Sequence, residues 1–513
     1  MKTTPTPWRI PLLAAETLLV FLAFAAIHFA VMHDLPSWPY LDGAYHWLVM
    51  EAIWHDGWWR DIDWLPYTVL GDAGPDHHWL YHLLLAPFAA IDDRVLAAHA
   101  ANAASFALVP ASLNLALRLC GVRWAPLWVM LAMATTYQPL FRWSLLRAQT
   151  LASAYLVLFI VVVCRRHKAW LVALPFLFMQ SYHAAALLAW PALCMAGVAW
   201  WRERVLAWQL LALPALGGAL ALLLSPWYPQ NIGYFVFHVF SKVGNTLNLD
   251  VGMEWSPMLP VELLERLWPQ LGVLGLVVLL AAVQRRLRAG DAGLVALGTT
   301  AFVVVLTLQH GRFIEYLPQL VVLSAALLAR DAGITVRGSA ARAAIGLVCL
   351  AAAAQFGAVL AEIHADKQGH DLGSRIASVE RFRATSAFVA GHSAPGDVIM
   401  DTDWGDFPML VINLPERRFV TGLDPNYLAQ RSPDKFIALY KLNGALPLDD
   451  GEVIDVRATF GADWVVTRNR TAIEHLQATG QLHGAISDLW GIWIYVGDDA
   501  AIIADMAAWM AAQ

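Results

Sequence analysis

The sequence predicts an α-helical polytopic membrane protein with about eleven transmembrane helices, followed by a C-terminal external α/β domain. Of its 513 residues, 59% are hydrophobic and 14% are charged, and the mean hydropathy is +0.53. This composition is too apolar for a soluble protein. Apolar runs of span length recur up to residue 364, whereas the composition from Asp366 onward is that of a soluble domain. We therefore expect a transmembrane domain at 1–364 and an external domain at 365–513.

The order of the spans follows from apolar runs and from the basic clusters between them. Cytoplasmic loops carry the excess of Lys and Arg, so an even number of crossings must separate neighbouring basic clusters. This places the N-terminus inside and the C-terminus outside. The leftover apolar piece at 78–91 then lies on the outer face as an interfacial or re-entrant helix. The expected spans are 11–32, 95–117, 126–140, 146–164, 170–182, 184–200, 205–224, 268–283, 293–308, 313–329 and 343–363.

Charge and cysteine content exclude several functional classes. The formal net charge is −6 and no long basic patch occurs, so the sequence gives no indication of nucleic-acid binding. The four cysteines, Cys120, Cys164, Cys194 and Cys349, lie in or beside apolar spans. Their position disfavours disulfides and a cysteine-based metal site.

The external domain alternates strand and helix patterns, which is typical of a small α/β layer. We expect helices at 375–392, 433–442 and 452–460. We expect strands at 397–401, 418–421, 463–467, 482–487 and 491–496.

The first external loop, at 33–94, gathers acids and histidines. Asp42 follows the first span, with His46 one helical turn beyond it, and can act as a general base toward a hydroxyl; a helix cap is the alternative. Asp61 and Asp63 form an acid-x-acid pair that can hold a divalent cation, although a solvated loop is the favoured explanation. His77 precedes His78 and His82, whose i, i+4 spacing suits metal ligation or a phosphate, with interfacial anchoring as the alternative.

Arginines stand at two further external positions. Arg142 and Arg147 lie in or beside the loop at 141–149, and Arg312 lies at the outer end of a span, against the positive-inside trend. A planar guanidinium suits bidentate contact with a phosphate. Salt bridges with Glu315 or with Glu254, which lies in the long external loop at 225–267, are the alternative explanation.

The order of these features resembles the C-type (GT-C) membrane glycosyltransferases that use polyprenyl-phosphate sugars. The likeness covers most of the chain and is distant, as in a bacterial branch of that superfamily related to the oligosaccharyltransferase catalytic subunit. The residues that carry it are LDGAYHW, DHHWLYHLLLAPF, LLRAQTLASAYLVL, SPWYPQN with VGMEWSP, GRFIEYLPQLVVL, and DTDWGDFPMLVINLPERRFVTGLDPNY.

The resemblance implies inverting glycosyl transfer from a polyprenyl-phosphate donor to a glycan, lipid or protein acceptor, on the periplasmic face of a bacterial cytoplasmic membrane. Asp42 matches the first-loop catalytic acid, and Arg312 matches a phosphate-contacting arginine. Arg147 and the three histidines are further donor-phosphate candidates. The residues expected to contact donor or acceptor are Tyr45, His46, Glu254, Trp404 and Asp406.

Two departures from the family pattern limit these implications. Many relatives carry a second acid in the second external loop, where this chain has Arg147-Ala148-Gln149. The full tryptophan-tryptophan-aspartate motif is also absent, which puts transfer to asparagine in protein in doubt. We expect no required cofactor and weak or absent dependence on Mg or Mn, because guanidinium groups can neutralise a leaving phosphate.

Two other functional classes remain open from the sequence. A transporter or flippase for a lipid-linked substrate would place the same acids and arginines along a passage, but the spans are nearly free of charge, with Glu16 as the main exception. A non-catalytic anchor would only present the C-terminal domain.

Overall fold

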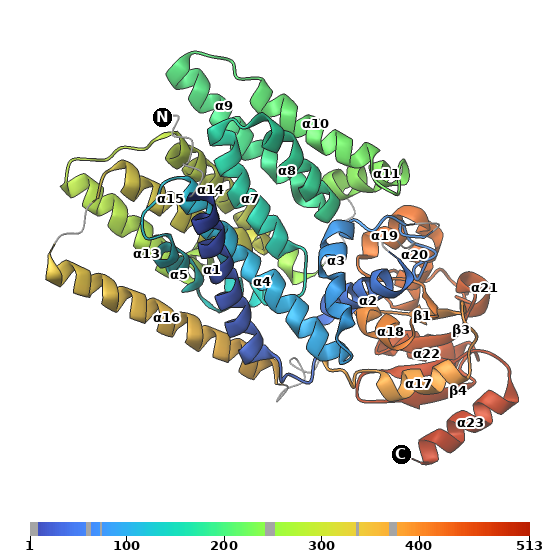
Figure 1. Ribbon diagram of the computed structural model, residues 1–513. Helices are drawn as coiled ribbons and strands as arrows, with labels where there is room; N and C mark the ends of the chain where they lie inside the picture. Colours follow the sequence, from blue (N-terminus) through green and yellow to red (C-terminus); the bar gives the residue numbers. More distant parts are fainter. Residues whose placement is uncertain are drawn as a thin grey trace. The chain divides into compact units, whose positions relative to one another are not determined.

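Most of the described chain is α-helical, and a five-stranded sheet lies in its C-terminal third (Figure 1). The structure is a computed structural model that describes residues 9–57, 63–71, 74–241, 252–334, 338–368 and 377–512. Contacts divide the chain into two compact units. We call them the helical unit (Met1–Leu35, His77–Ser225 and Gly252–Gln368) and the sheet unit (Pro36–Asp76, Pro226–Val251 and Gly369–Gln513).

The helical unit is a bundle of α-helices joined by short turns. Its elements are α1 (Arg9–Met32), α3 (Trp79–Leu85), η1 (Ala86–Ala90), α4 (Arg94–Leu119), α5 (Ala125–Met133), α6 (Tyr137–Trp143), α7 (Gln149–Arg165), α8 (Lys168–Ser181), η2 (His183–Leu188), α9 (Ala189–Glu203), α10 (Gln209–Leu223), η4 (Met253–Trp255), α13 (Pro260–Val283), α14 (Asp291–Gln309), η5 (Gly311–Tyr316), α15 (Leu317–Asp331) and α16 (Ser339–Lys367).

Within the described residues, seven helical segments are long and apolar enough to cross a membrane, and all belong to the helical unit. They are Pro11–Met32, Arg94–Leu119, His183–Glu203, Pro260–Val283, Asp291–Gln309, Gly311–Asp331 and Arg342–Lys367. The expected count of eleven spans and the inside–outside orientation stay predictions.

Burial separates central from peripheral helices. In the most apolar window of Arg94–Leu119 78% of residues are buried, against 11% for Pro11–Met32 and 22% for Arg342–Lys367. α1 packs against α4, and α4 packs against α7 (Figure 1). The outer faces of α1 and α16 expose large apolar side chains such as Leu19 and Leu350, as expected of helices in contact with lipid.

One predicted span differs from the structure. Residues 126–140 form two short helices, α5 and α6, because Pro139 lacks the N–H that a continuous helix would need there. Gln270 on α13 provides a hydrogen-bond donor to the carbonyl groups at the end of α5. Its Nε2 lies 3.2 Å from the carbonyl oxygen of Leu131 and 3.3 Å from those of Ala132 and Ala134.

The sheet unit has a mixed sheet with helices around it. Its elements are α2 (Leu41–Asp56), α11 (Gln230–Val236), the π-turn η3 (Phe237–Ser241), α17 (Arg383–Gly391), β1 (Val398–Asp401), α18 (Phe407–Asn413), β2 (Arg418–Phe419), α19 (Pro425–Arg431), α20 (Pro433–Leu442), α21 (Val456–Phe460), β3 (Ala462–Thr467), α22 (Arg470–Ala478), β4 (Gly484–Ser487), β5 (Ile492–Tyr495) and α23 (Ala500–Ala511).

The strand order is β2-β1-β3-β5-β4. β1 pairs in parallel with β2 and β3, whereas β5 pairs antiparallel with β3 and β4. The core beside this sheet is formed by apolar side chains of its central strands, including Met400, Val465 and Ile494, packed with Leu439 and Leu476 from α20 and α22. All five strands predicted from the sequence are present within one or two residues of their expected bounds.

The segment after the first span is part of the sheet unit. The backbone N–H of Phe419 in β2 donates to the carbonyl of Trp64 at 2.7 Å, and the indole of Trp64 donates to the carbonyl of Pro415 at 2.8 Å. The hydroxyl of Tyr67 donates to the carbonyl of Phe460 at 2.7 Å. The segment at 64–67 is therefore held by the α/β layer. The two units each combine three separate segments of the chain, because they are defined by contacts between residues. The predicted division into two domains at 364/365 therefore stays a prediction.

Candidate functional site

Three arginines converge on Glu254 in the helical unit. Arg142 lies on α6, Arg147 follows it in the turn before α7, and Arg312 lies on η5. Their guanidinium nitrogens approach the Glu254 carboxylate at 3.0, 3.2 and 3.3 Å, respectively. Arg142 also donates from Nε to Glu315 at 2.8 Å. We call these five residues the arginine cluster.

The local fold fixes both sides of this cluster. The N–H of Gly311 donates to the carbonyl of Ser256 at 2.9 Å, which ties the turn carrying Glu254 to the start of η5. The indole of Trp143 donates to the carbonyl of Glu315 at 2.9 Å, which ties α6 to η5. Short elements distant in sequence are therefore locked together around the charged groups.

The arginine cluster carries three guanidinium groups and two carboxylates, so its formal charge is +1 when all are ionised. Burial alone would raise the pKa of Glu254, but the positive charges of Arg312, Arg142 and Arg147 outweigh it and hold that pKa well below its usual range. One terminal nitrogen of Arg142 is buried and makes no hydrogen bond within the described part of the chain. A buried site with excess positive charge and spare donor capacity suits an anion.

A layer of rings adjoins the cluster. The Arg312 guanidinium lies over the indole of Trp255, with Cζ 4.3 Å from the ring centroid, and donates to the hydroxyl of Tyr182 at 3.2 Å. The ring of Tyr182 stacks on His78 with centroids 5.3 Å apart. The predicted histidine group therefore adjoins the arginines through Tyr182.

The histidines themselves lie close together. The ring centroid of His77 lies 3.8 Å from that of His78 and 5.4 Å from that of His183. The ring centroid of His82, on α3, lies 5.9 Å from that of His78. His78 and His82 are both buried, and Nδ1 of His78 lies 3.3 Å from the carbonyl oxygen of Ser181.

The structure brings together the predicted residues Arg147, Arg312 and Glu254, and the salt bridge to Glu254 named as the alternative is present. It adds Tyr182 and Trp255, which the sequence did not single out. It also adds Arg142, which was named beside Arg147 but was not among the expected donor-phosphate contacts. The only sequence signal for Arg142 was its position five residues before Arg147 in the same loop.

The remaining predicted residues lie in the sheet unit. Asp42 lies in the first turn of α2, and Tyr40 occupies the N-cap position. Tyr45 and His46 are buried on the same helix, and the ring of Tyr45 lies 6.2 Å from Phe407.

Trp404 and Asp406 follow β1. Asp406 is buried and bonded to Arg381, and it also accepts from Arg468 at 2.8 Å. Trp404 lines a cavity of the sheet unit together with Asp403 and Arg468.

The predicted divalent-cation site at Asp61 and Asp63 lies only partly within the described residues. Asp61 lies outside the described residues, and Asp63 is 59% exposed and 3.6 Å from Arg418. Elsewhere in the described ranges, no three His, Cys, Asp or Glu side chains are grouped as ligands for a metal ion. The predicted weak metal dependence stays a prediction.

Comparisons with known proteins identify the fold. No family model and no curated protein matches the chain. The oligosaccharyltransferase of Archaeoglobus fulgidus, solved with a tethered acceptor peptide containing the NVT sequon, is 12% identical with a TM-score of 0.59, over 94% of this chain and 74% of its own. The same enzyme in complex with Zn and sulfate is 12% identical with a TM-score of 0.59, over 93% of this chain and 72% of its own. ArnT from Cupriavidus metallidurans bound to undecaprenyl phosphate is 15% identical with a TM-score of 0.58, over 97% of this chain and 99% of its own. The chain is thus a multi-pass membrane protein with the fold of the C-type membrane glycosyltransferases.

Proposed function

We propose that this protein is an inverting glycosyltransferase that moves a sugar from a polyprenyl-phosphate donor to an acceptor hydroxyl, on the external face of a bacterial cytoplasmic membrane. The observation that carries the proposal is the arginine cluster, which places the guanidinium groups of two buried arginines and one partly buried arginine around two carboxylates. A cluster with net positive charge needs an anion to balance it, and a lipid phosphate supplies one. The fold shared with solved glycosyltransferases supports the same reaction class.

In this proposal the phosphate of the sugar donor binds at Arg312 and Arg147. Arg142 is a third residue that donates hydrogen bonds to it. Glu254, expected to contact the donor or the acceptor, pairs with all three guanidinium groups and competes with the phosphate for them. His77, His78 and His82 adjoin these groups through Tyr182 and donate hydrogen bonds to the phosphate or to the sugar beside it.

The reaction forms one bond and breaks one bond at the anomeric carbon. The acceptor oxygen attacks from the face opposite the phosphate, and the electron pair of the breaking C–O bond moves onto the phosphate oxygen. The arginines stabilise the negative charge that develops there. Asp42 accepts or orients the proton of the attacking hydroxyl. Tyr45, His46, Trp404 and Asp406 are proposed contacts of the acceptor or the donor sugar.

The donor half of the proposal is tested by lipid binding to purified full-length protein in nanodiscs. We expect undecaprenyl phosphate to bind and undecaprenol to bind more weakly, because only the former carries the anion. Arg312→Ala should weaken phosphate-lipid binding by about 10- to 150-fold, the equivalent of one charge-assisted contact. Arg383→Ala, an exposed arginine of the sheet unit, is the matched control. Equal affinity for the two lipids, or no effect of Arg312→Ala, would refute this half.

The transfer half is tested in cells. Mass spectrometry of surface and lipid-linked glycans should reveal a glycan missing from a deletion strain. Wild-type protein should restore it, whereas Asp42→Asn at equal protein level should not. Restoration by Asp42→Asn would instead support the non-catalytic anchor.

A further inference from the structure

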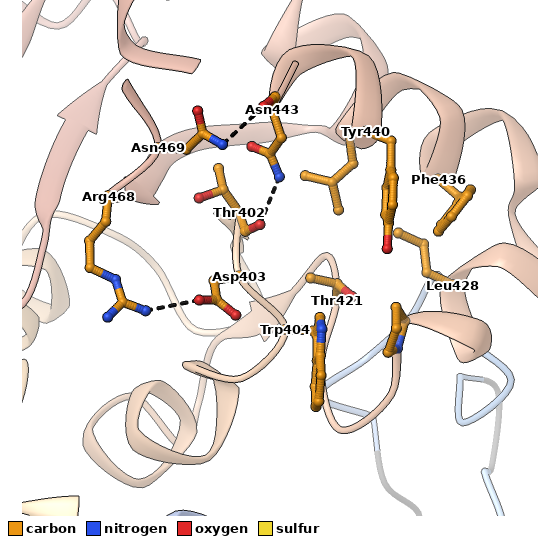
Figure 2. Close-up of a pocket in the computed structure, with 12 residues that line it drawn as sticks. Thr402, Asp403, Trp404, Thr421, Leu428, Phe436, Tyr440, Asn443, Arg468 and Asn469 are labelled. Carbon is orange, nitrogen blue, oxygen red and sulfur yellow. Dashed lines mark hydrogen bonds and ion pairs between the residues drawn. The ribbon is translucent and has the colours of Figure 1, made fainter. Parts of the chain in front are cut away.

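The sheet unit contains a cavity of about 330 Å³ where two inner strands of its sheet, β1 and β3, end (Figure 2). Thr402, Asp403 and Trp404 come directly after β1, and Arg468 and Asn469 come directly after β3. The cavity therefore opens at the carboxyl ends of two adjacent parallel strands.

This position is the topological switch point of the sheet. From β1 the chain passes through α18 to β2 on one side, and from β3 it passes through α22 to the strands on the other side. Loops that leave neighbouring strands in opposite directions separate, and the crevice between them is the usual ligand site of open α/β sheets.

One wall of the cavity is aromatic. Phe436 and Tyr440 lie on α20 with ring centroids 4.1 Å apart, and Trp404 adds an indole at the lower edge (Figure 2). The opposite wall is polar: Arg468 donates to Asp403 at 2.9 Å. The two charges offset each other, and Arg468 also binds Asp406.

An amide held between the walls has an unused acceptor. Nδ2 of Asn443 donates to the carbonyl of Thr402 at 2.9 Å, and Nδ2 of Asn469 donates to the carbonyl of Asn443 at 3.0 Å. The first bond fixes the orientation of the Asn443 side chain, and the second is made to its backbone. Its Oδ1 is buried and has no hydrogen-bond partner among the residues that the structure describes. Asn443 therefore lines the cavity between the aromatic and polar walls.

We propose that this cavity, which we call the switch-point pocket, binds an uncharged saccharide. The apolar C–H face of a pyranose packs against Trp404 and Tyr440, while its hydroxyls meet the Asp403–Arg468 pair. The charge balance of the pocket disfavours a phosphate or nucleotide. Its volume lies at the lower end of the range for small-molecule sites and suits one or two sugar rings.

The inference rests on the proposed function in one respect only: if the protein transfers sugars, the saccharide bound here is a glycan acceptor. Saccharide binding itself requires no transfer. The two proposals can therefore fail separately.

Saturation-transfer NMR on the full-length protein in nanodiscs tests the inference. The probes are methyl glycosides of glucose, galactose, mannose and N-acetylglucosamine and their β-linked disaccharides. We expect at least one to bind, with saturation strongest at ring C–H protons. Trp404→Ala should weaken binding about tenfold and Trp404→Phe should largely retain it. Tyr440→Leu provides a second variant if Trp404→Ala does not fold.

Trp509→Ala is the control, because this indole lies on α23 near Phe388 and does not line the pocket. Arg312→Ala should keep saccharide binding while losing undecaprenyl phosphate. Binding of none of the probes, or binding unchanged in both Trp404→Ala and Tyr440→Leu, would overturn the inference. Competition at the pocket by an Asn-Val-Thr peptide but by no glycoside would assign it to a peptide instead.

Discussion

Arg142 and Glu315 form an ion pair that is almost completely buried: Nε lies 2.8 Å from Oε2, and the two side chains are 8% and 3% exposed. Removing one partner of a buried pair leaves the other charge without compensation, whereas removing both can be nearly neutral. The pair therefore has consequences for stability that do not depend on the reaction.

We expect Arg142→Met to lower the free energy of unfolding by about 3–5 kcal/mol, because Glu315 is then buried without its guanidinium. The double variant Arg142→Met/Glu315→Leu should recover much of this loss. The thermal midpoint in nanodiscs measures both effects. Arg166→Ala is the control, since Arg166 and Glu203 pair at an exposed position, and it should change the midpoint little. A single variant as stable as wild type would contradict the expectation.

Glu254 offers a test of the electrostatics of the arginine cluster. Its carboxylate pairs with the three guanidinium groups that we propose as the phosphate contacts. The carboxylate and the phosphate therefore compete for the same positive charges. Glu254→Gln keeps the hydrogen-bond acceptor and removes the charge. We expect undecaprenyl phosphate to bind about tenfold more tightly and transfer to become slower, because the lipid phosphate is released more slowly after reaction. Weaker binding by Glu254→Gln would mean that the carboxylate serves mainly to position the arginines.

The pattern of the C-terminal strands made the sheet predictable. Each strand is a short apolar run bounded by Gly, Asp or Pro, and all five were found. The helices α18 and α19 were missed because each has only seven residues. The apolar residues of Phe407–Asn413 show no period that separates a buried helix from a strand. The strand order, with β1 between β2 and β3, depends on contacts distant in sequence, so the switch-point pocket could not be predicted.

The arginine cluster was predictable only in part. The unusual position of Arg312 outside a span end and the neighbouring acids indicated a pairing, and Glu254 is indeed the partner. Arg142 was named beside Arg147 in the same loop, but its pairing with both Glu254 and Glu315 depends on contacts between residues distant in sequence. A hydropathy pattern does not show which distant residues a charged side chain contacts.

The role of Asp42 is tested by kinetics. A general base contributes about 10²- to 10⁴-fold to the rate, so Asp42→Asn should lower kcat by that factor and leave undecaprenyl phosphate binding unchanged. Asp56→Asn is the matched control, since Asp56 is exposed at the other end of the same helix, α2. An equal loss of lipid binding and of kcat in Asp42→Asn would indicate a structural role, and unchanged kcat would remove Asp42 from the reaction.

Removal of divalent cations with EDTA tests whether guanidinium groups alone stabilise the leaving phosphate or whether a divalent cation is also needed. Since three arginines already concentrate positive charge at the arginine cluster, we expect EDTA to leave most of the transfer activity of the reconstituted protein intact. Added Mg or Mn should change the rate less than Arg312→Ala does. The measurement is sugar transfer at fixed ionic strength, because salt alone weakens interactions between exposed charges. Activity abolished by EDTA and restored by Mg or Mn would contradict the expectation. It would also direct attention to Asp42 with Asp61 or Asp63 as metal ligands, which Asp63→Asn would then test.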